Sequence, residues 1–291
     1  MPNASGSLAL KKMQKKIAPR PPTYTVIARK AGWKFRLRGK RATMLLVLTY
    51  HRIVKTPGDI KGFFDVSAGE LDAHLQVARQ IWGGAAAPAD LQNEQRERSS
   101  ARAGFLMTFD DGTADHYFTA APILERHGVR GVFFVNTARW GAEGYLTLEQ
   151  CRELQARGHA IESHAHQHKP LAGLLEEQLL NQLTESRRRL CESGLGEWSL
   201  FAPPGGIYDA AVVNAAKTCG YRVLRTVNWG YNTRLNPFAV ESIIINRRTA
   251  GGWFRLMASP NAEAAKKAVF RIKETVKNGL PSVYSFLKKR R

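Results

Sequence analysis

The stretch "GFLMTFDDG", residues 104–112, places two aspartates directly after an apolar run and directly before a glycine. Successive side chains of a strand point to opposite faces, so adjacent carboxylates serve one site only where the strand ends and the backbone turns. Gly112 permits that turn. Taken alone, Asp110 and Asp111 also fit a solvated turn or a helix N-cap. The stretch therefore predicts a strand end whose function depends on what the fold brings beside it.

Short apolar runs alternate with segments of helical period on both sides of this stretch. The run "MLLVLTY" at 44–50 precedes a predicted helix at 67–81 that Ser67 caps, and Thr147 and Gln150 form the capping box of a later helix. Further strands are predicted at 104–111, 129–136, 159–166, 198–205 and 221–228. Strand followed by helix, repeated about six times, predicts an α/β fold with a parallel sheet and helices outside it. In such folds the chemistry gathers at the carboxyl ends of the strands.

A histidine cluster follows one of these predicted strands, in "SHAHQH" at 163–168. His164 and His168 are four residues apart, so they converge on one side of a helical turn and also on one face of a strand. Two imidazoles and one carboxylate make a metal site that leaves positions for water and substrate. If a cation takes one aspartate, the other is free to act as a base, which predicts amide or ester hydrolysis. The alternative is that these are ordinary surface or core histidines.

With these residues in view, the sequence resembles the polysaccharide deacetylases, the family of the NodB-homology fold that is also called carbohydrate esterase family 4. The resemblance covers about residues 44–250 and rests on "TFDDG" at 108–112, "SHAHQH" at 163–168 and "FAPPGG" at 201–206. Weaker support comes from "LTYHRI" at 48–53, "FDVS" at 64–67 and "AAKTCGYRVLRT" at 215–226. The first two motifs are specific in their order and separation.

The resemblance implies a distorted (β/α) barrel that removes acetyl groups from sugars with a divalent metal. It implies that Asp110 is the catalytic base and that Asp111 binds the metal. The same resemblance implies that the metal is bound together with His164 and His168. The "PPGG" loop would shape the sugar site through Pro204 and Gly206, and the backbone N–H of Gly205 would help to stabilise the oxyanion.

The sequence departs from the family pattern at several positions. Ala165 follows the first metal-binding histidine where many members have Ser or Thr, so a hydrogen bond to the ligand shell is missing. Ala202 replaces an arginine that in many members orients the catalytic aspartate, and Gly205 replaces the loop tyrosine. No histidine follows His168, so the family's late Leu-x-x-His segment has no counterpart.

The general acid is therefore open, and His51, at the end of the first predicted strand, is the leading candidate. His166 is the second candidate. For each, an ordinary structural or surface histidine is an equal alternative. Trp229 is a candidate to stack on a sugar ring, with a core tryptophan as its alternative.

The net charge of +20 is concentrated at the two ends of the chain. Residues 1–41 contain 12 Lys and Arg and no Asp or Glu, residues 246–291 contain 12 basic and 2 acidic residues, and the remainder carries −2. We therefore expect a basic N-terminal extension at 1–43, the barrel at 44–250 and a basic amphipathic C-terminal extension at 251–291. Such ends suit an anionic lipid surface, a phosphate-bearing substrate or nucleic acid, or are simply solvated.

No stretch reaches the ~18 apolar residues of a membrane-spanning helix, and the run at 44–50 fits a buried strand better than a secretory signal. We expect a cytoplasmic protein, with peripheral association at the inner membrane face as the role of the basic ends. The three cysteines are expected to be buried and unpaired.

The sequence predicts a metal-dependent hydrolase that removes acetyl groups from an N-acetylated sugar or polysaccharide. Zn²⁺ is the first choice of metal, with Co²⁺, Ni²⁺ and Mn²⁺ as alternatives. A second hypothesis is a deacetylase or deformylase of a lipid-linked sugar at the membrane surface. A third is a degenerate, non-catalytic glycan-binding barrel, suggested by the missing general acid and by Ala202. A nucleic-acid role ranks last because the barrel contains no matching motif.

Overall fold

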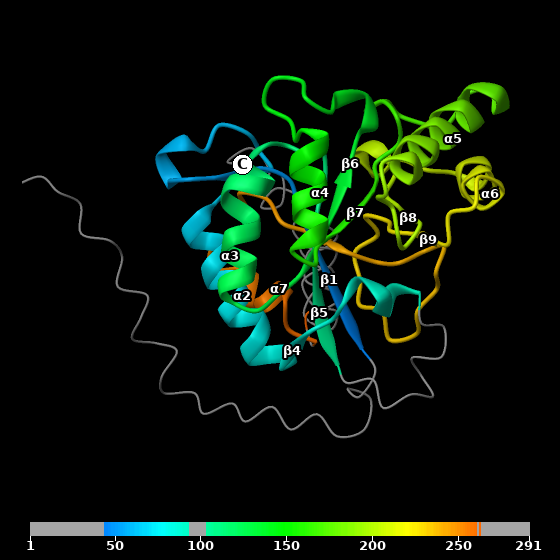
Figure 1. Cartoon of the computed structure of the whole chain (residues 1–291). Helices are drawn as coiled ribbons and strands as arrows, with labels where there is room; N and C mark the ends of the chain where they lie inside the picture. Colours follow the sequence, from blue (N-terminus) through cyan, green and yellow to red (C-terminus); the bar gives the residue numbers. More distant parts are fainter. Residues whose placement is uncertain (1–43, 93–102, 261, 263–291) are drawn as a thin grey trace, which may run out of the picture. The chain divides into compact units, whose positions relative to one another are not determined.

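The protein is described by a computed structural model over residues 44–92, 103–260 and 262. Within these residues, eight parallel strands form one sheet in the order β10-β1-β5-β6-β7-β8-β9, with β4 paired to β5 (Figure 1). The strands are β1 Leu45–Tyr50, β4 Gly84–Ala85, β5 Gly104–Phe109, β6 Gly131–Val135, β7 Ala160–Ser163, β8 Leu200–Phe201, β9 Val223–Leu224 and β10 Ile243–Ile244. The short strands β2 Ile53–Val54 and β3 Val66–Ser67 form a separate pair.

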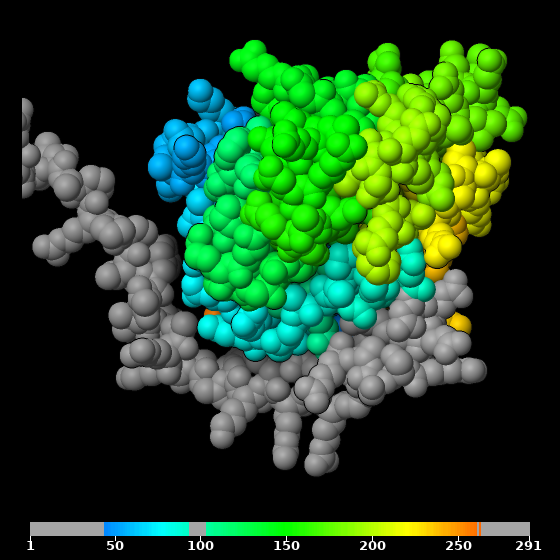
Figure 2. Space-filling view, in the orientation of Figure 1, coloured from blue at the N-terminus to red at the C-terminus, as the bar shows by residue number. Residues whose placement is uncertain are grey.

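Helices connect successive strands and lie outside the sheet (Figure 1). They are α2 Ala68–Trp82, the π-helix η3 His116–Ala120 that continues into α3 Ala121–Arg126, α4 Leu148–Ala156, α5 Glu176–Glu192, α6 Ala210–Thr218 and α7 Phe254–Met257. The green and yellow-green segments that contain α3, α4 and α5 cover the strands from this side (Figure 2). The predicted alternation of strand and helix is confirmed.

Local sequence signals explain where these elements begin. Ser67 caps α2 and forms a capping box with Glu70, and Thr147 and Gln150 do the same for α4, as predicted. β5 is buried along its whole length because β1 and β6 cover its edges and its alternate side chains pack into two different core clusters. A strand buried on both faces needs an apolar run rather than an alternating pattern, and this explains "GFLMTF".

The segment 240–245 links the two edges of the sheet into a distorted barrel. Val240 pairs with Arg225 next to β9, and the N–H of Thr226 donates to the Val240 carbonyl at 2.8 Å. A few residues later, β10 pairs in parallel with β1, where Leu48 lies opposite Ile243. The expected (β/α) barrel is therefore observed, and this short segment, which the sequence does not predict as a strand, completes it.

The packing continues beyond residue 250, where the C-terminal extension was expected to begin. Phe254 in α7 is buried and stacks on His74 of α2, with ring centroids 3.8 Å apart. The Trp82 indole N–H donates to the Ala258 carbonyl at 2.8 Å. The predicted extension at 1–43 and the amphipathic segment at 263–291 lie outside the described residues.

Two further sequence expectations can be compared with the structure. All three cysteines are free, as expected, but only Cys151 is buried, while Cys219 is half-buried and Cys191 is exposed. The expectation of three buried cysteines was wrong because Cys191 falls on the solvent side of α5, whose buried face is formed by Leu179, Leu183 and Leu190. Among the described residues, no helix is long and apolar enough to cross a bilayer.

Candidate metal-dependent active site

The carboxyl ends of β5 and β7 bring the two predicted motifs together. The backbone turns sharply after each strand: Asp111 has φ of +76° and Ala165 has φ of +62°. Left-handed backbone is costly for residues with a side chain and is found at sites that the surrounding structure holds in place. Gly112 is required at the first turn, since a Cβ there would lie 2.9 Å from Val135 Cγ1.

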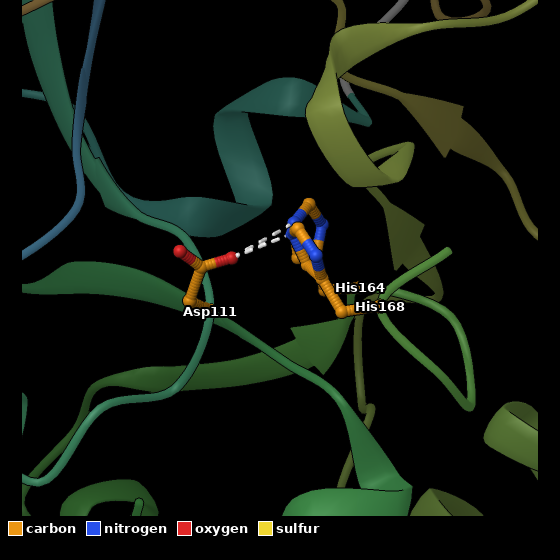
Figure 3. Close-up of side chains that lie close together, drawn as sticks. All are labelled: Asp111, His164 and His168. Carbon is orange, nitrogen blue, oxygen red and sulfur yellow. Dashed lines mark ion pairs between the residues drawn. The ribbon is translucent and has the colours of Figure 1, made fainter. Parts of the chain in front are cut away.

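Asp111, His164 and His168 form one cluster at this edge (Figure 3). Their ligand atoms all lie within 4.8 Å of one another. Asp111 Oδ1 is 3.0 Å from His168 Nε2 and 3.5 Å from His164 Nε2. Burial raises the pKa of Asp111, but its interactions with the two imidazoles outweigh this effect and hold the pKa below its usual range. The three predicted ligands are therefore brought together.

The donor set fits a divalent cation. Nδ1 of His164 lies 2.7 Å from the Ala202 carbonyl, which can only accept, so Nδ1 carries the proton and Nε2 presents its lone pair to the cluster. Two imidazole nitrogens and one carboxylate oxygen suit zinc and its neighbours among the divalent metals. The residues thus define a candidate metal site, and the identity of the metal stays a prediction.

Asp110 lies beside this cluster and is paired with an arginine that the sequence reasoning missed. Arg225 follows β9, is completely buried, and donates from Nη2 to Asp110 Oδ1. Burial raises the pKa of Asp110, but attraction to Arg225 and His164 outweighs it and lowers the pKa from its usual value. Within the described residues, no other side chain hydrogen-bonds Asp110, so Oδ2 remains to accept a proton.

Because Arg225 is present, Ala202 does not leave the catalytic aspartate without an arginine. Ala202 was interpreted as the loss of the arginine that orients the aspartate, but a different strand end supplies that arginine, and its guanidinium also lies 5.1 Å from the Phe134 ring centroid. The available signal was a positive charge inside the strand-like run "YRVLRTV" at 221–227. A cation in a buried strand needs a partner, because an unpaired buried charge is strongly unfavourable.

His51 lies at the same edge, after β1, as the sequence predicted. Its ring interacts electrostatically with Asp110, Asp111 and His164. Burial lowers the pKa of His51, and the two aspartates partly oppose this. Nδ1 of His51 is buried and has no hydrogen-bond partner among the described residues. His51 therefore lies beside both aspartates with an unpaired ring nitrogen, and its role as the proton donor stays a prediction.

His166 does not join the cluster. Its Nδ1 lies 3.0 Å from Thr137 Oγ1, and the charged groups that act on its pKa are Arg189, Glu185 and Arg188 of α5. Because Ala165 has a positive φ, the chain turns between the histidines, and His166 faces α5 rather than the aspartates. The structure does not support the second candidate for the general acid.

The remaining predicted residues are those of the "PPGG" loop and Trp229. Pro204 is buried, Gly205 is exposed with φ of +64°, and Gly206 packs so closely that a Cβ would lie 2.4 Å from Val227 Cγ2. Trp229 is partly buried against the core, and its ring centroid lies 5.5 Å from that of Tyr231. These contacts favour the core alternative for Trp229, while the roles of the loop residues stay predictions.

Comparison with known proteins agrees with this geometry. The polysaccharide deacetylase family profile matches residues 98–224. The YxkH protein of Bacillus subtilis (strain 168), whose name places it among the polysaccharide deacetylases, is 27% identical over 221 residues, 75% of this chain and 77% of that protein. The peptidoglycan-N-acetylglucosamine deacetylase of Bacillus cereus is 30% identical over 142 residues, 47% of this chain and 63% of that enzyme.

A solved structure shows the same fold. The Streptococcus pyogenes deacetylase PplD, solved in complex with acetate, superposes with a TM-score of 0.65 at 22% identity, covering 75% of this chain and 99% of that one. The fold is thus the NodB-like (β/α) barrel, with an Asp-Asp and two-histidine site at the carboxyl ends of its strands. Residues 98–224 match the model of the polysaccharide deacetylase family, and the chain is similar to YxkH over 75% of its length.

Proposed function

We propose that this protein is a metal-dependent hydrolase that removes acetyl groups from an N-acetylated sugar or polysaccharide. The observation that carries the proposal is the pair of Asp110 and Arg225 beside the cluster of Asp111, His164 and His168. Names of related proteins support the same substrate class, since they include peptidoglycan-N-acetylglucosamine deacetylase and chitin deacetylase.

The two adjacent aspartates have different roles, one as a metal ligand and the other as the catalytic base. Asp111 and the two histidines would hold the cation, which supplies a Lewis acid for the acyl oxygen and lowers the pKa of the attacking water. Asp110 accepts the proton of that water, and Arg225 keeps its carboxyl ionised and fixed in orientation. The Gly205 N–H assists the oxyanion. His51, in its protonated form, gives a proton to the leaving amine, and the cycle closes when Asp110 releases its proton to solvent and His51 takes one up.

The test is acetate release by the purified protein from N-acetylglucosamine oligomers, run with zinc, cobalt, nickel and manganese. Substitution of Asp110 by Asn should lower kcat by about 100- to 10,000-fold, because the base is lost while the metal ligands remain. Metal content and unfolding temperature should stay close to those of the unmodified chain. Full activity in Asp110→Asn would contradict the assignment of Asp110 as the base. A metal-loaded protein that releases neither acetate nor formate from any N-acyl sugar would contradict the proposed hydrolase activity.

We also propose that the substrate is presented at an anionic membrane, on the cytoplasmic face, as a lipid-linked sugar. The basic charge of residues 1–41 and 246–291 supports this. Further support comes from Trp253 and Leu256, two large apolar side chains that are exposed and that belong to the basic stretch 246–291. Tryptophan and leucine next to basic residues are typical of segments that bind the membrane interface.

A further inference from the structure

Two neighbouring phenylalanines stand exposed at the rim of the site. Phe63 and Phe64 are 46% and 39% exposed. The Phe64 ring stacks on His51 with centroids 4.5 Å apart, and the Phe63 ring meets Phe64 edge-on at 5.0 Å. A continuous row of rings therefore runs from a residue of the catalytic pocket to the surface. Adjacent exposed rings at the rim of a site offer an apolar surface to a ligand.

Buried contacts hold these rings in place. Asp65 is buried, and its Oδ2 accepts hydrogen bonds from the N–H groups of Lys61 and Gly62 at 2.9 and 2.7 Å. Gly62 leaves no space for a side chain, since a Cβ would lie 2.7 Å from Asp65 Oδ1. On the other side, the Arg247 N–H donates to the Phe63 carbonyl at 3.0 Å. The loop is thus preorganised with its rings outward, which lowers the entropic cost of binding.

Positive charge lies next to the rings. The guanidinium of Arg248 is 5.7 Å from the Phe63 ring centroid, and Arg247 and Arg248 are both exposed. Within the part of the chain that the structure describes, neither arginine forms an ion pair with a carboxylate. The guanidinium groups are therefore available to a ligand.

We propose that Phe63, Phe64, Arg247 and Arg248 form a substrate subsite for a sugar unit that carries an anionic group, a carboxylate or a phosphate, next to the acetylated sugar. An exposed aromatic ring can pack against the apolar face of a pyranose. Arginine binds carboxylate and phosphate through two parallel N–H donors. The proposal rests on the proposed function for the position of the acetylated sugar, and it adds the chemical class of the adjoining unit.

The first experiment measures binding to the Asp110→Asn variant, so that turnover is not required. The probes are a neutral tetramer of N-acetylglucosamine, a tetramer that alternates glucuronic acid with N-acetylglucosamine, and a polyprenyl diphosphate-linked N-acetylglucosamine in detergent. We expect at least one anionic probe to bind more tightly than the neutral tetramer. Arg248→Gln and Arg247→Gln should each reduce that preference about fivefold at low salt. Arg222→Gln is the matched control, because exposed Arg222 precedes β9 at its amino end, whereas Arg247 and Arg248 follow the carboxyl end of β10.

The second experiment tests the rings in the active enzyme. Phe63→Ala should raise KM for tetrasaccharides several-fold more than for a small acetyl ester, and Phe63→Tyr should restore the tetrasaccharide KM because the ring face is kept. Leu175→Ala, which removes an exposed apolar side chain at the start of α5, is the control.

The outcomes separate the two proposals. If the protein prefers the glucuronic acid tetramer and the preference depends on the arginines, the anionic group belongs to the glycan. If it prefers the diphosphate probe in the same way, the anionic group belongs to a lipid carrier. Two results together would overturn the subsite. The Asp110→Asn protein would bind all three probes with equal affinity, and its Arg247→Gln and Arg248→Gln variants would bind them with that same affinity. If binding depends on the arginines but the unmodified protein releases no acyl group, the subsite stands and the proposed hydrolase activity fails.

Discussion

At the scale of single residues, Asp110 and Asp111 are neighbours with different surroundings. Asp110 is buried against Arg225, whereas Asp111 is half-buried and faces His164 and His168. The positive φ of Asp111 turns its side chain away from the direction that a continuing strand would give it. The two aspartates are chemically identical. Their different roles therefore come from the backbone geometry and from the side chains that each carboxylate contacts.

Removal of the metal should abolish activity without unfolding the protein, because a barrel of this size has its own hydrophobic core. A chelator followed by dialysis should give an inactive chain that zinc or cobalt restores. His164→Ala should bind less than stoichiometric metal by elemental analysis. His166→Ala is the control from the same motif and should keep its metal, because His166 faces Thr137 and α5. Equal metal loss in both variants would contradict the ligand assignment.

Substitution of Arg225 should impair both stability and catalysis. Arg225→Met leaves the Asp110 charge buried without its partner, and breaking a buried ion pair in this way costs about 3–5 kcal/mol of unfolding free energy. Arg225→Lys keeps the charge but loses the planar fork, so we expect an intermediate effect. Urea denaturation and kcat measure the two consequences. Arg222→Met, an exposed position three residues earlier, is the control and should change the unfolding free energy by less than about 0.5 kcal/mol.

At the scale of elements, the polar side chain of Glu162 fixes β7 to the segment around β8. Its two carboxylate oxygens accept the N–H groups of Trp198 at 2.9 Å and Leu200 at 2.8 Å. Burial nevertheless raises the pKa of Glu162 to about 8, with the two hydrogen bonds opposing the shift. The carboxyl is therefore protonated more readily in the folded chain than in the unfolded chain.

This shift predicts how stability depends on pH. A pKa raised in the folded state stabilises the fold while the group is protonated, so this contribution is complete below about pH 4 and falls as pH rises toward 8. The slope from this one group is at most about 1.4 kcal/mol per pH unit. Urea denaturation between pH 5.5 and 8.5 should show the decline, and Glu162→Gln should flatten it. Exposed Glu177→Gln should leave the profile unchanged, and parallel profiles for all three proteins would contradict the shift.

At the scale of the whole molecule, charge and exposed apolar groups predict binding to anionic vesicles. The full chain should float with vesicles that contain phosphatidylglycerol and should not float with neutral phosphatidylcholine, and salt should weaken the binding. Replacing both Trp253 and Leu256 with Ser should reduce the bound fraction several-fold, because their apolar contact is lost. Flotation that is equal on neutral and anionic vesicles, or absent on both, would contradict the membrane proposal.

The sequence by itself determined the elements and the metal-binding motif, because their signals are local. Apolar runs, the caps at Ser67 and Thr147 and the spacing of His164 and His168 each depend on residues a few positions apart. These signals also predicted the class of chemistry. They did not show β10, because it follows β9 without an intervening helix and so stands outside the alternation of strand and helix.

Only the tertiary structure decided which distant residues complete the site. Arg225 reaches Asp110 across 115 positions of sequence because β9 and β5 end at the same edge of the sheet. In the same way, the loop of Phe63 and Phe64 meets His51 through the anchor at Asp65 and the turn at Arg247. Such contacts depend on strand order and barrel closure, which arise from packing over the whole chain, and no local spacing encodes them.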